Sequence, residues 1–235
     1  MGSIPAHATV LKARMSRTGH LAPWAPPPID EVTAAIRRDR PDVVFATHVE
    51  TASGILLPDD YLRAIAEATH AAGGLFVLDC VASGALWVDL EACGEKGGHA
   101  YHATVPTDSL MRLRDTMMET ERAGFERMRE SQWDLGRKVR SLLVRAGFPS
   151  VAADGYASPS VVVSYTDDPE IHSGKRFIEA GLQTAAGVPL QCDEPADFRS
   201  FRIGLFGLEK RGHVDRTVAS LERALAAIGA GAHAR

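Results

Sequence analysis

Two short polar segments hold most of the residues that could do chemistry, and each follows an apolar run. Residues 47–54 read Thr-His-Val-Glu-Thr-Ala-Ser-Gly, and residues 79–84 read Asp-Cys-Val-Ala-Ser-Gly. The apolar runs before them are short and typical of buried strands. Because ligands of parallel sheets lie at the carboxyl ends of the strands, we expect both segments to border one ligand site.

Asp79 is the most informative residue of these segments. It directly follows the apolar run 75–78, and a carboxylate at the end of a buried strand is costly unless a cation or hydrogen-bond donors meet it. One interpretation is therefore a site for a cationic group. The other is an ordinary turn or cap residue, because Asp commonly begins turns and caps helices.

Arg202 is the second residue with a clear chemical interpretation. It lies in the otherwise apolar run Phe-Arg-Ile-Gly at 201–204. The planar fork of a guanidinium suits a carboxylate, which would make Arg202 a carboxylate-binding residue. An edge-strand arginine paired with a nearby acid explains the pattern equally well.

A metal site is a further hypothesis, because His and carboxylate groups are ligands of zinc and iron. It would make the chain a metal-dependent hydrolase. The candidate ligands are His48, Glu50, Asp79, His99 and His102. Their spacing matches no recognised metal motif, and scattered surface histidines are the commoner explanation. We therefore expect no metal and keep the hydrolase as an alternative.

Composition restricts the class of protein. The 235 residues carry 26 Lys and Arg against 30 Asp and Glu, a net charge of −4, so no excess of positive charge favours nucleic acid as a partner. No apolar run has the length of a membrane span, so we expect no membrane partner. Cys80, Cys93 and Cys192 form no Cys-x-x-Cys pair, which predicts reduced thiols in a cytoplasmic protein. Their apolar or small-residue surroundings predict that they fill core space.

The elements that would position these residues alternate between helix and strand in the N-terminal part. Prolines make residues 1–28 an extended lead-in. Apolar residues at helical spacing over 29–36 predict a helix that Pro41 ends, and a second helix begins near Pro58 and is closed by Gly73. Helices that alternate with apolar strands predict a parallel sheet covered by helices.

The composition changes after Gly94. Residues 95–104 form a polar joint, and helical spacing then runs from Pro106 to Ala146 with an interruption near 123–124. We expect a domain boundary at this joint and a smaller α+β unit after it. Its expected elements are strands at 161–163, 188–190 and 201–204, and helices around 177–178 and 214–225.

Four segments are informative in combination: residues 48–54, 78–83, 101–106 and 201–207. In order and chemistry they resemble the class V aminotransferases of pyridoxal-phosphate fold type I, in the alanine/serine-glyoxylate branch. The resemblance implies an α/β fold in which residues 1–104 are a partial cofactor-binding large domain, with a mostly parallel sheet and helices. Residues 105–235 would be the C-terminal α+β small domain with a long linking helix.

The resemblance also implies a cofactor, pyridoxal 5'-phosphate, and roles for individual residues. Asp79 would face the pyridine nitrogen and keep it protonated, so that the ring can withdraw electrons from the substrate. Thr51 would lie beside the phenolic oxygen and Val81 against the ring face. Tyr101 and Thr104 would reach the phosphate of the neighbouring subunit's cofactor, which implies a homodimer.

Arg202 would bind the α-carboxylate of the substrate. The implied reaction moves an amino group from serine or alanine to glyoxylate or a similar 2-oxo acid, so the small-molecule partners are an amino acid and a 2-oxo acid.

The chain departs from the family at the lysine that holds the cofactor as a Schiff base and moves the proton. Only Lys96 lies between Asp79 and Tyr101, and it is a weak substitute, so no catalytic residue is assigned. The family's N-terminal phosphate-binding part also has no counterpart. Because general acid–base help is commonly worth about 10²–10⁴-fold in rate, we expect transamination to be absent or impaired.

The same departures from the family also support an alternative to an aminotransferase. The chain would be a non-catalytic, truncated remnant or a fragment that binds a partner. Missing sheet strands would leave apolar edges that favour association.

Overall fold

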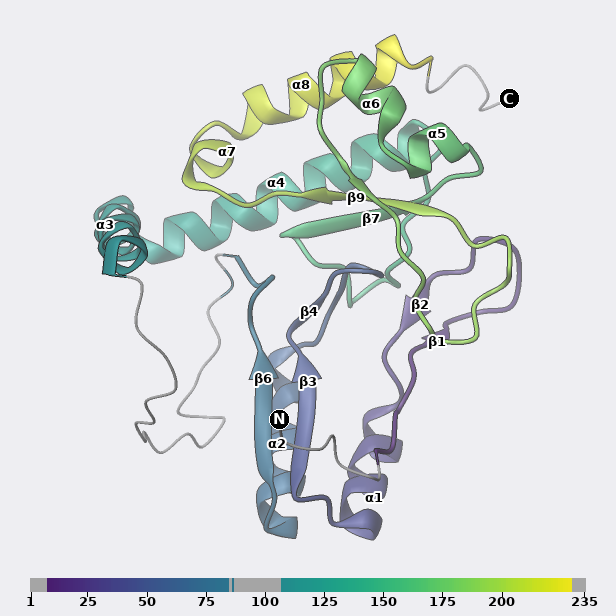
Figure 1. Ribbon diagram of the computed structural model, residues 1–235, viewed down its shortest axis with the longest axis vertical. Coiled ribbons are helices and arrows are strands. Elements are labelled where there is room, and N and C mark those ends of the chain that lie inside the picture. The colour runs from purple at the N-terminus through teal and green to yellow at the C-terminus, as the bar shows by residue number, and fades with distance from the viewer. Residues whose placement is uncertain (1–7, 85, 87–106, 230–235) are drawn as a thin grey trace.

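The chain is a mixed α/β protein, seen here in a computed structural model (Figure 1). The structure describes residues 8–84, 86 and 107–229. The elements before residue 84 are β1 (Arg14–Met15), β2 (Trp24–Ala25), α1 (Ile29–Asp39), β3 (Val43–Thr47), β4 (Val49–Glu50), β5 (Ile55–Leu56), α2 (Asp59–Ala72) and β6 (Leu75–Asp79). Those after residue 106 are α3 (Thr107–Ala123), α4 (Phe125–Arg145), β7 (Val161–Tyr165), α5 (Pro169–His172), α6 (Lys175–Glu179), β8 (Ala185–Ala186), β9 (Ser200–Gly204), α7 (Leu208–Gly212) and α8 (Val214–Ala227).

β3 and β6 form the predicted parallel pair, in register from Val43 opposite Leu75 to Thr47 opposite Asp79. Alternate residues of both strands point to α1 and α2, which lie together on one side of the pair (Figure 1). Phe76 of β6 and Leu62 of α2 are buried in this core. On the other face, Val43, Phe45 and Leu75 are exposed, so one face of the pair is covered and the other is open.

The two helices begin and end where the sequence predicts. Each carries two acidic residues in its first turn, where the helix dipole favours negative charge. α1 ends at Arg40, directly before Pro41, in the left-handed conformation. α2 ends at Gly73, whose φ of +86° is the left-handed conformation that glycine adopts without strain.

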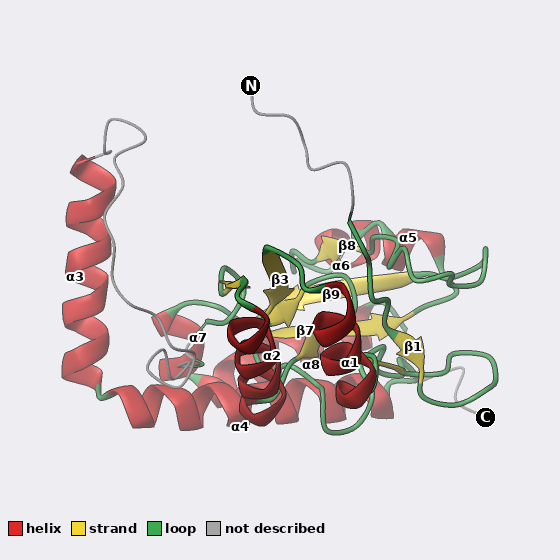
Figure 2. Cartoon of the chain, turned by 90° about the horizontal axis from the view of Figure 1, so that it is seen from below, coloured by secondary structure: helices red, strands yellow, loops and turns green. Residues whose placement is uncertain are grey.

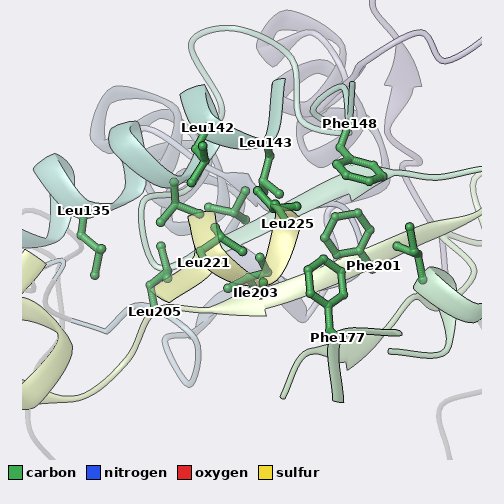
Figure 3. Packing of buried hydrophobic residues seen from close by; sticks show 14 residues of the cluster. Leu135, Leu142, Leu143, Phe148, Phe177, Phe201, Ile203, Leu205, Leu221 and Leu225 are labelled. Carbon is green, nitrogen blue, oxygen red and sulfur yellow. The ribbon is translucent and has the colours of Figure 1, made fainter. Parts of the chain in front are cut away.

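The C-terminal unit is an antiparallel sheet of order β7-β9-β8 packed against α4 and α8. Phe201 of β9 lies between Phe148 and Phe177, with ring centroids 5.3 and 5.2 Å away (Figure 3). The fully buried residues of this core include Leu135 and Leu143 of α4. This sheet fixes the backbone of Arg202, which pairs with Val163 on one side and Ala185 on the other.

Gly136 of α4 allows a close approach of helix and loop. A Cβ there would lie 2.5 Å from the Cα of Pro159 and 2.7 Å from its carbonyl oxygen. Alanine is favoured over glycine in a helix by about 1 kcal/mol, but overpacking costs about 1–3 kcal/mol, so we expect Gly136→Ala to lower the free energy of unfolding by up to about 2 kcal/mol in a urea titration. Gly212→Ala is the matched control, because its Cβ would enter open space. Equal stability of the two variants would contradict this packing.

Of two expectations about the C-terminal elements, one is confirmed and the other is wrong. The long helical pattern is interrupted as predicted, at Gly124, between α3 and α4. The strand expected at 188–190 is wrong, since the third strand of the sheet is β8 at Ala185–Ala186. The carboxylate of Glu194 accepts hydrogen bonds from the backbone N–H groups of Leu190, Gln191 and Cys192, so these groups are engaged in a loop and not in a sheet.

The cysteines also differ from the expectation of core-filling thiols. Cys80 is exposed and Cys192 is only half-buried, while Cys93 lies outside the described residues. Cys80 is exposed because it lies in the turn that follows β6, beyond the covered part of the strand pair. In the part of the chain that the structure describes, no helix is long and apolar enough to cross a membrane.

Candidate active site

The candidate site begins at the shared carboxyl edge of β3 and β6, where Thr47 pairs with Asp79. The backbone continues this pairing for one more bond, because His48 donates its N–H to the carbonyl oxygen of Asp79 at 2.9 Å. The hairpin of β4 and β5 follows β3, and the loop 80–84 follows β6. The two polar segments therefore lie at one edge of the sheet, as predicted.

Asp79 is half-buried and has one oxygen available. Its Oδ1 accepts a hydrogen bond from the N–H of Val81 at 2.9 Å, which fixes the carboxylate against its own loop. Its Oδ2 has no hydrogen-bond partner within the described residues. The turn interpretation of Asp79 is thus correct for one oxygen, while the other can accept from a ligand.

Glu50 shapes the turn that carries Thr51. Its two carboxylate oxygens accept hydrogen bonds from the N–H groups of Ala52 and Ser53, at 2.8 and 2.7 Å, and from the Ser53 hydroxyl at 2.6 Å. These bonds hold residues 51–54 in a tight turn and leave the Thr51 side chain half-exposed beside the sheet edge. Glu50 is therefore a structural residue of this turn.

His48 is buried under the loop that follows β6. Its Nδ1 lies 2.7 Å from the hydroxyl oxygen of Ser83, and its side chain is almost fully covered. Burial lowers the pKa of His48 below its usual value, because a charged imidazole would lose its hydration, and Asp59 opposes the shift more weakly. The neutral ring therefore ties the β3 end to the loop 80–84.

Protonation of His48 should weaken the fold. The unfolded chain takes up the proton near pH 6.5, before the folded protein does, so the free energy of unfolding should fall as the pH drops below about 6.5, until His48 titrates in the folded state. His48→Gln should flatten this pH dependence of the free energy of unfolding. Urea titrations between pH 7.5 and 5.5, about one unit either side of the ordinary histidine pKa of the unfolded chain, measure it. His70→Gln, at an exposed position, is the control. An unchanged pH slope in His48→Gln would contradict the assignment.

The loop 80–84 and the β4–β5 hairpin both pack against the C-terminal unit. Ser160 donates its hydroxyl to the carbonyl oxygen of Ala82 at 2.9 Å, and Gly54 abuts Val161 and Val163 so closely that a Cβ would lie 2.9 Å from the latter. A buried cluster spans this contact and contains Trp24, Val49, Ile55, Ala82, Leu86, Val151, Ala152, Val161, Val163 and Tyr165. The division at residues 104 and 105 remains our proposal, and this cluster joins the two parts across it.

Ser160 is a site residue that the sequence does not indicate. It links the loop after Asp79 to the strand that carries Arg202, because its carbonyl oxygen also accepts the N–H of Leu205 at 2.8 Å. A lone serine before an apolar run carries no sequence signal for a contact to residue 82.

Arg202 presents the end of its guanidinium to solvent. Its Nε donates to the carbonyl oxygen of Ala186 at 2.8 Å, which orients the planar group. Within the described residues, its two terminal nitrogens make no hydrogen bond and no ion pair. The alternative of an arginine paired with a nearby acid therefore finds no support here, and both nitrogens can form the two parallel bonds that a carboxylate accepts.

Three of the predicted site residues lie outside the described residues: Lys96, Tyr101 and Thr104. The four lysines of the described part make contacts away from Asp79. Lys12 pairs with Asp193, Lys138 with Asp134 and Asp215, and Lys175 with Glu170, while Lys210 donates to the carbonyl oxygen of Phe206. None of these four takes the place of the expected covalent lysine.

The metal hypothesis finds no support in the described part of the chain, where no three His, Cys, Asp or Glu side chains come close enough to hold an ion. Glu50 and His48 are engaged by the turn and by Ser83. His99 and His102 lie outside the described residues.

Comparison with known proteins identifies the fold. No family model matches the sequence, and no curated protein matches it. Among solved structures, the chain is similar to alanine–glyoxylate aminotransferase from Nostoc sp., with a TM-score of 0.63 and 18% identity over 83% of this chain and 65% of that one. It is also similar to ureidoglycine–glyoxylate aminotransferase from Bacillus subtilis, with a TM-score of 0.64 and 18% identity over 87% of this chain and 68% of that one.

Pyridoxamine–pyruvate aminotransferase from Mesorhizobium loti gives a TM-score of 0.63 at 16% identity, over 87% of this chain and 69% of that one. The described α/β architecture is therefore that of the fold type I pyridoxal-phosphate aminotransferases, as the resemblance implied. The chain spans about two thirds of the length of these structures, 65% in the Nostoc enzyme.

Proposed function

We propose that this chain is a pyridoxal-phosphate-dependent aminotransferase by descent, directed to serine or alanine and to glyoxylate or a similar 2-oxo acid, and impaired in its catalysis. One observation carries the proposal. Within the described residues, Asp79 keeps one carboxylate oxygen without a hydrogen-bond partner at the carboxyl edge of a parallel strand pair, in the fold of aminotransferases. Bound there, the cofactor would supply a ring that withdraws electrons from the substrate's Cα.

The residues at this edge fit the ring end of that cofactor. Oδ2 of Asp79 would accept the proton of the pyridine nitrogen, while Oδ1 stays bound to Val81. The Val81 side chain is 92% exposed, which is unusual for valine, and an exposed aliphatic side chain beside Asp79 can cover a ring face. Thr51, held by the Glu50 turn, would donate its hydroxyl to the phenolic oxygen.

Arg202 would orient the substrate. The bond from its Nε to Ala186 aims both terminal nitrogens in one direction, so the substrate's α-carboxylate would be held by two parallel hydrogen bonds. Ser160 would maintain the spacing between this clamp and the loop after Asp79, because it bonds to both parts.

The expected impairment follows from the lysines. Those of the described part are engaged elsewhere, and Lys96 is the single lysine between Asp79 and Tyr101 in the sequence. Without a lysine at the ring, the cofactor would be held by noncovalent contacts alone. The proton at Cα would have no amine to accept it, which lowers the rate by about 10²–10⁴-fold.

A titration of the purified chain with pyridoxal phosphate, followed by the cofactor's absorbance and fluorescence, tests this function. We expect saturable binding that dialysis reverses, and slow amino transfer from serine or alanine to glyoxylate. The complete absence of saturable binding would refute the proposal.

We further propose a homodimer in the cytoplasm, with Tyr101 and Thr104 reaching the cofactor of the neighbouring subunit. The three widely spaced cysteines support the location, since their odd number and spacing suggest no disulfide framework.

A second candidate function is that of a partner-binding remnant without catalysis. It is favoured by the open face of the β3–β6 pair, where Phe45 is 63% and Leu75 60% exposed. Exposed apolar strand faces promote association. Binding of pyridoxal phosphate distinguishes the two candidates, because a remnant would bind none.

A further inference from the structure

One face of β9 carries Arg202, Gly204 and, just beyond the end of the strand, Phe206. Phe206 belongs to the short connection from β9 to α7, and β7 lies beside β9 (Figure 2). Because side chains alternate along a strand, the residues between these three point to the other face. That other face is buried in the core and contains Phe201, Ile203 and Leu205 (Figure 3).

The face with Arg202 is turned toward the N-terminal unit. Val163 and Val161 of β7 lie opposite Arg202 and Gly204, and residues directly opposite in an antiparallel pair share a face. Both valines are buried in the cluster that joins the loop 80–84 and the β4–β5 hairpin to the sheet. Arg202 and Gly204 therefore lie at the border of this contact, where they are half-buried and exposed.

Phe206 lies where the strand of Arg202 meets the loop that follows Asp79. A Cβ on Gly84, the last residue of that loop, would lie 3.4 Å from Cδ1 of the Phe206 ring. The ring is nevertheless 37% exposed, so part of it remains open to a ligand. This face thus extends from the carboxylate-binding residue to the loop beside the proposed cofactor ring.

Gly204 has neither a backbone nor a packing reason to be glycine within the described residues. Its φ is not in the left-handed region, so other residues could adopt its conformation. Within the described residues, a Cβ there would have only the edge of the Phe206 ring within 4 Å, at 3.3 and 3.4 Å. Glycine weakens a strand and often marks a place where a ligand approaches the backbone. The space over Gly204 is therefore available to a ligand.

We propose that this space is the subsite for the side chain of the amino acid and 2-oxo acid, and that Phe206 limits the length of that side chain. The inference rests on the proposed function, in which Arg202 holds the α-carboxylate. The substrate's side chain would lie over Gly204 and end against the ring of Phe206. Cα atoms two residues apart in a strand are about 6.6 Å apart, so the interval along β9 suits a short side chain.

A size limit requires that the ring stays in place, and Gln132 of α4 supports it. Gln132 is fully buried, and its Nε2 donates to the carbonyl oxygens of Pro159 at 2.9 Å and Leu205 at 3.3 Å. Leu205 directly precedes Phe206. The side-chain oxygen of Gln132 lies 3.5 Å from the position of a Cβ on Gly84, so the same residue also backs the loop that the ring contacts.

Binding of three 2-oxo acids to the full-length chain tests the subsite. Glyoxylate, pyruvate and phenylpyruvate differ only in the group that would lie over Gly204: hydrogen, methyl and benzyl. They have no amine that could react with the cofactor, so calorimetric titration of the chain in saturating pyridoxal phosphate measures binding alone. We expect phenylpyruvate to bind at least about tenfold more weakly than pyruvate.

Two substitutions should change this ranking in opposite directions. Phe206→Ala should strengthen the binding of phenylpyruvate about tenfold and leave that of glyoxylate unchanged, because only the benzyl group reaches the ring. Phe206→Leu should lie between the two and preserves the test if the alanine variant does not fold. Gly204→Ala should weaken pyruvate about tenfold more than glyoxylate, because only pyruvate has a methyl group that meets the added one.

The matched controls are Phe125→Ala, at a phenylalanine that is 48% exposed at the start of α4, and Gly212→Ala, whose Cβ enters open space. Both should keep the parent ranking. A parent chain that binds phenylpyruvate as tightly as pyruvate, or a ranking that neither Phe206→Ala nor Gly204→Ala changes, would overturn the subsite.

The same titrations without cofactor separate this inference from the proposed function, because Arg202, Gly204 and Phe206 all belong to the chain itself. If pyridoxal phosphate does not bind but the predicted ranking persists, the proposed function fails and the subsite is supported. If the cofactor binds and the ranking is absent, the subsite alone fails. Binding of none of the three acids, with or without cofactor, would also overturn it.

Discussion

Phe201→Ala should lower the free energy of unfolding by about 3–5 kcal/mol in a urea titration, the largest effect that we expect of any single substitution. The side chain is fully buried in β9 and packs its ring against Phe148 and Phe177. Its removal would leave a cavity between the sheet and α4, and this cavity adds to the loss of apolar burial.

Phe45→Ala is the control for this prediction, because it removes the same side chain from the open face of β3. We expect a change below about 1 kcal/mol there. Phe201→Leu should fold and lose less stability than Phe201→Ala, which preserves the test if the alanine variant does not fold. Similar losses at positions 45 and 201 would contradict the core described here.

Asp79→Asn should weaken the binding of pyridoxal phosphate about 10- to 100-fold, which is the value of a charge-assisted hydrogen bond of about 1.5–3 kcal/mol. The amide can still accept the N–H of Val81, so the loop should keep its shape. The amide of this variant has no negative charge, however, to keep the pyridine nitrogen protonated. The dissociation constant from the cofactor titration measures this effect.

Asp42→Asn is the matched control. Asp42 is exposed and precedes β3, at the opposite end of the strand pair from Asp79. Its amide variant should bind the cofactor like the parent chain. Equal affinities of the Asp42 and Asp79 variants would remove Asp79 from the cofactor site.

The N-terminal helices and strands could be predicted from the sequence because their signals are local. α1, α2, β3 and β6 are each delimited by apolar periodicity and by Pro41, Pro58 or Gly73. The prediction of an extended lead-in at residues 1–28 is less accurate. Trp24 in this segment is almost fully buried, and its ring N–H donates to the hydroxyl of Tyr165 at 3.0 Å. Such a contact between distant residues has no signature in either segment.

The site was predictable at its sheet edge and less so around it. Asp79 and Arg202 follow from residue type and strand context, and each has polar atoms without a partner among the described residues, which agrees with ligand binding. The roles of Glu50 and Ser160 depend on backbone geometry and on a long-range contact. Glu50 is a candidate metal ligand by sequence because a carboxylate that closes a turn and one that binds an ion look identical there.

The central claim is that the chain keeps the ring-binding edge of an aminotransferase site without the lysine that would hold the cofactor covalently. Reduction with borohydride in the presence of pyridoxal phosphate, followed by peptide mapping, tests it most directly. We predict low, scattered labelling of exposed lysines such as Lys175 and no stoichiometric adduct. A single stoichiometric adduct, above all on Lys96, that is lost in Asp79→Asn would contradict the claim and identify a working covalent site.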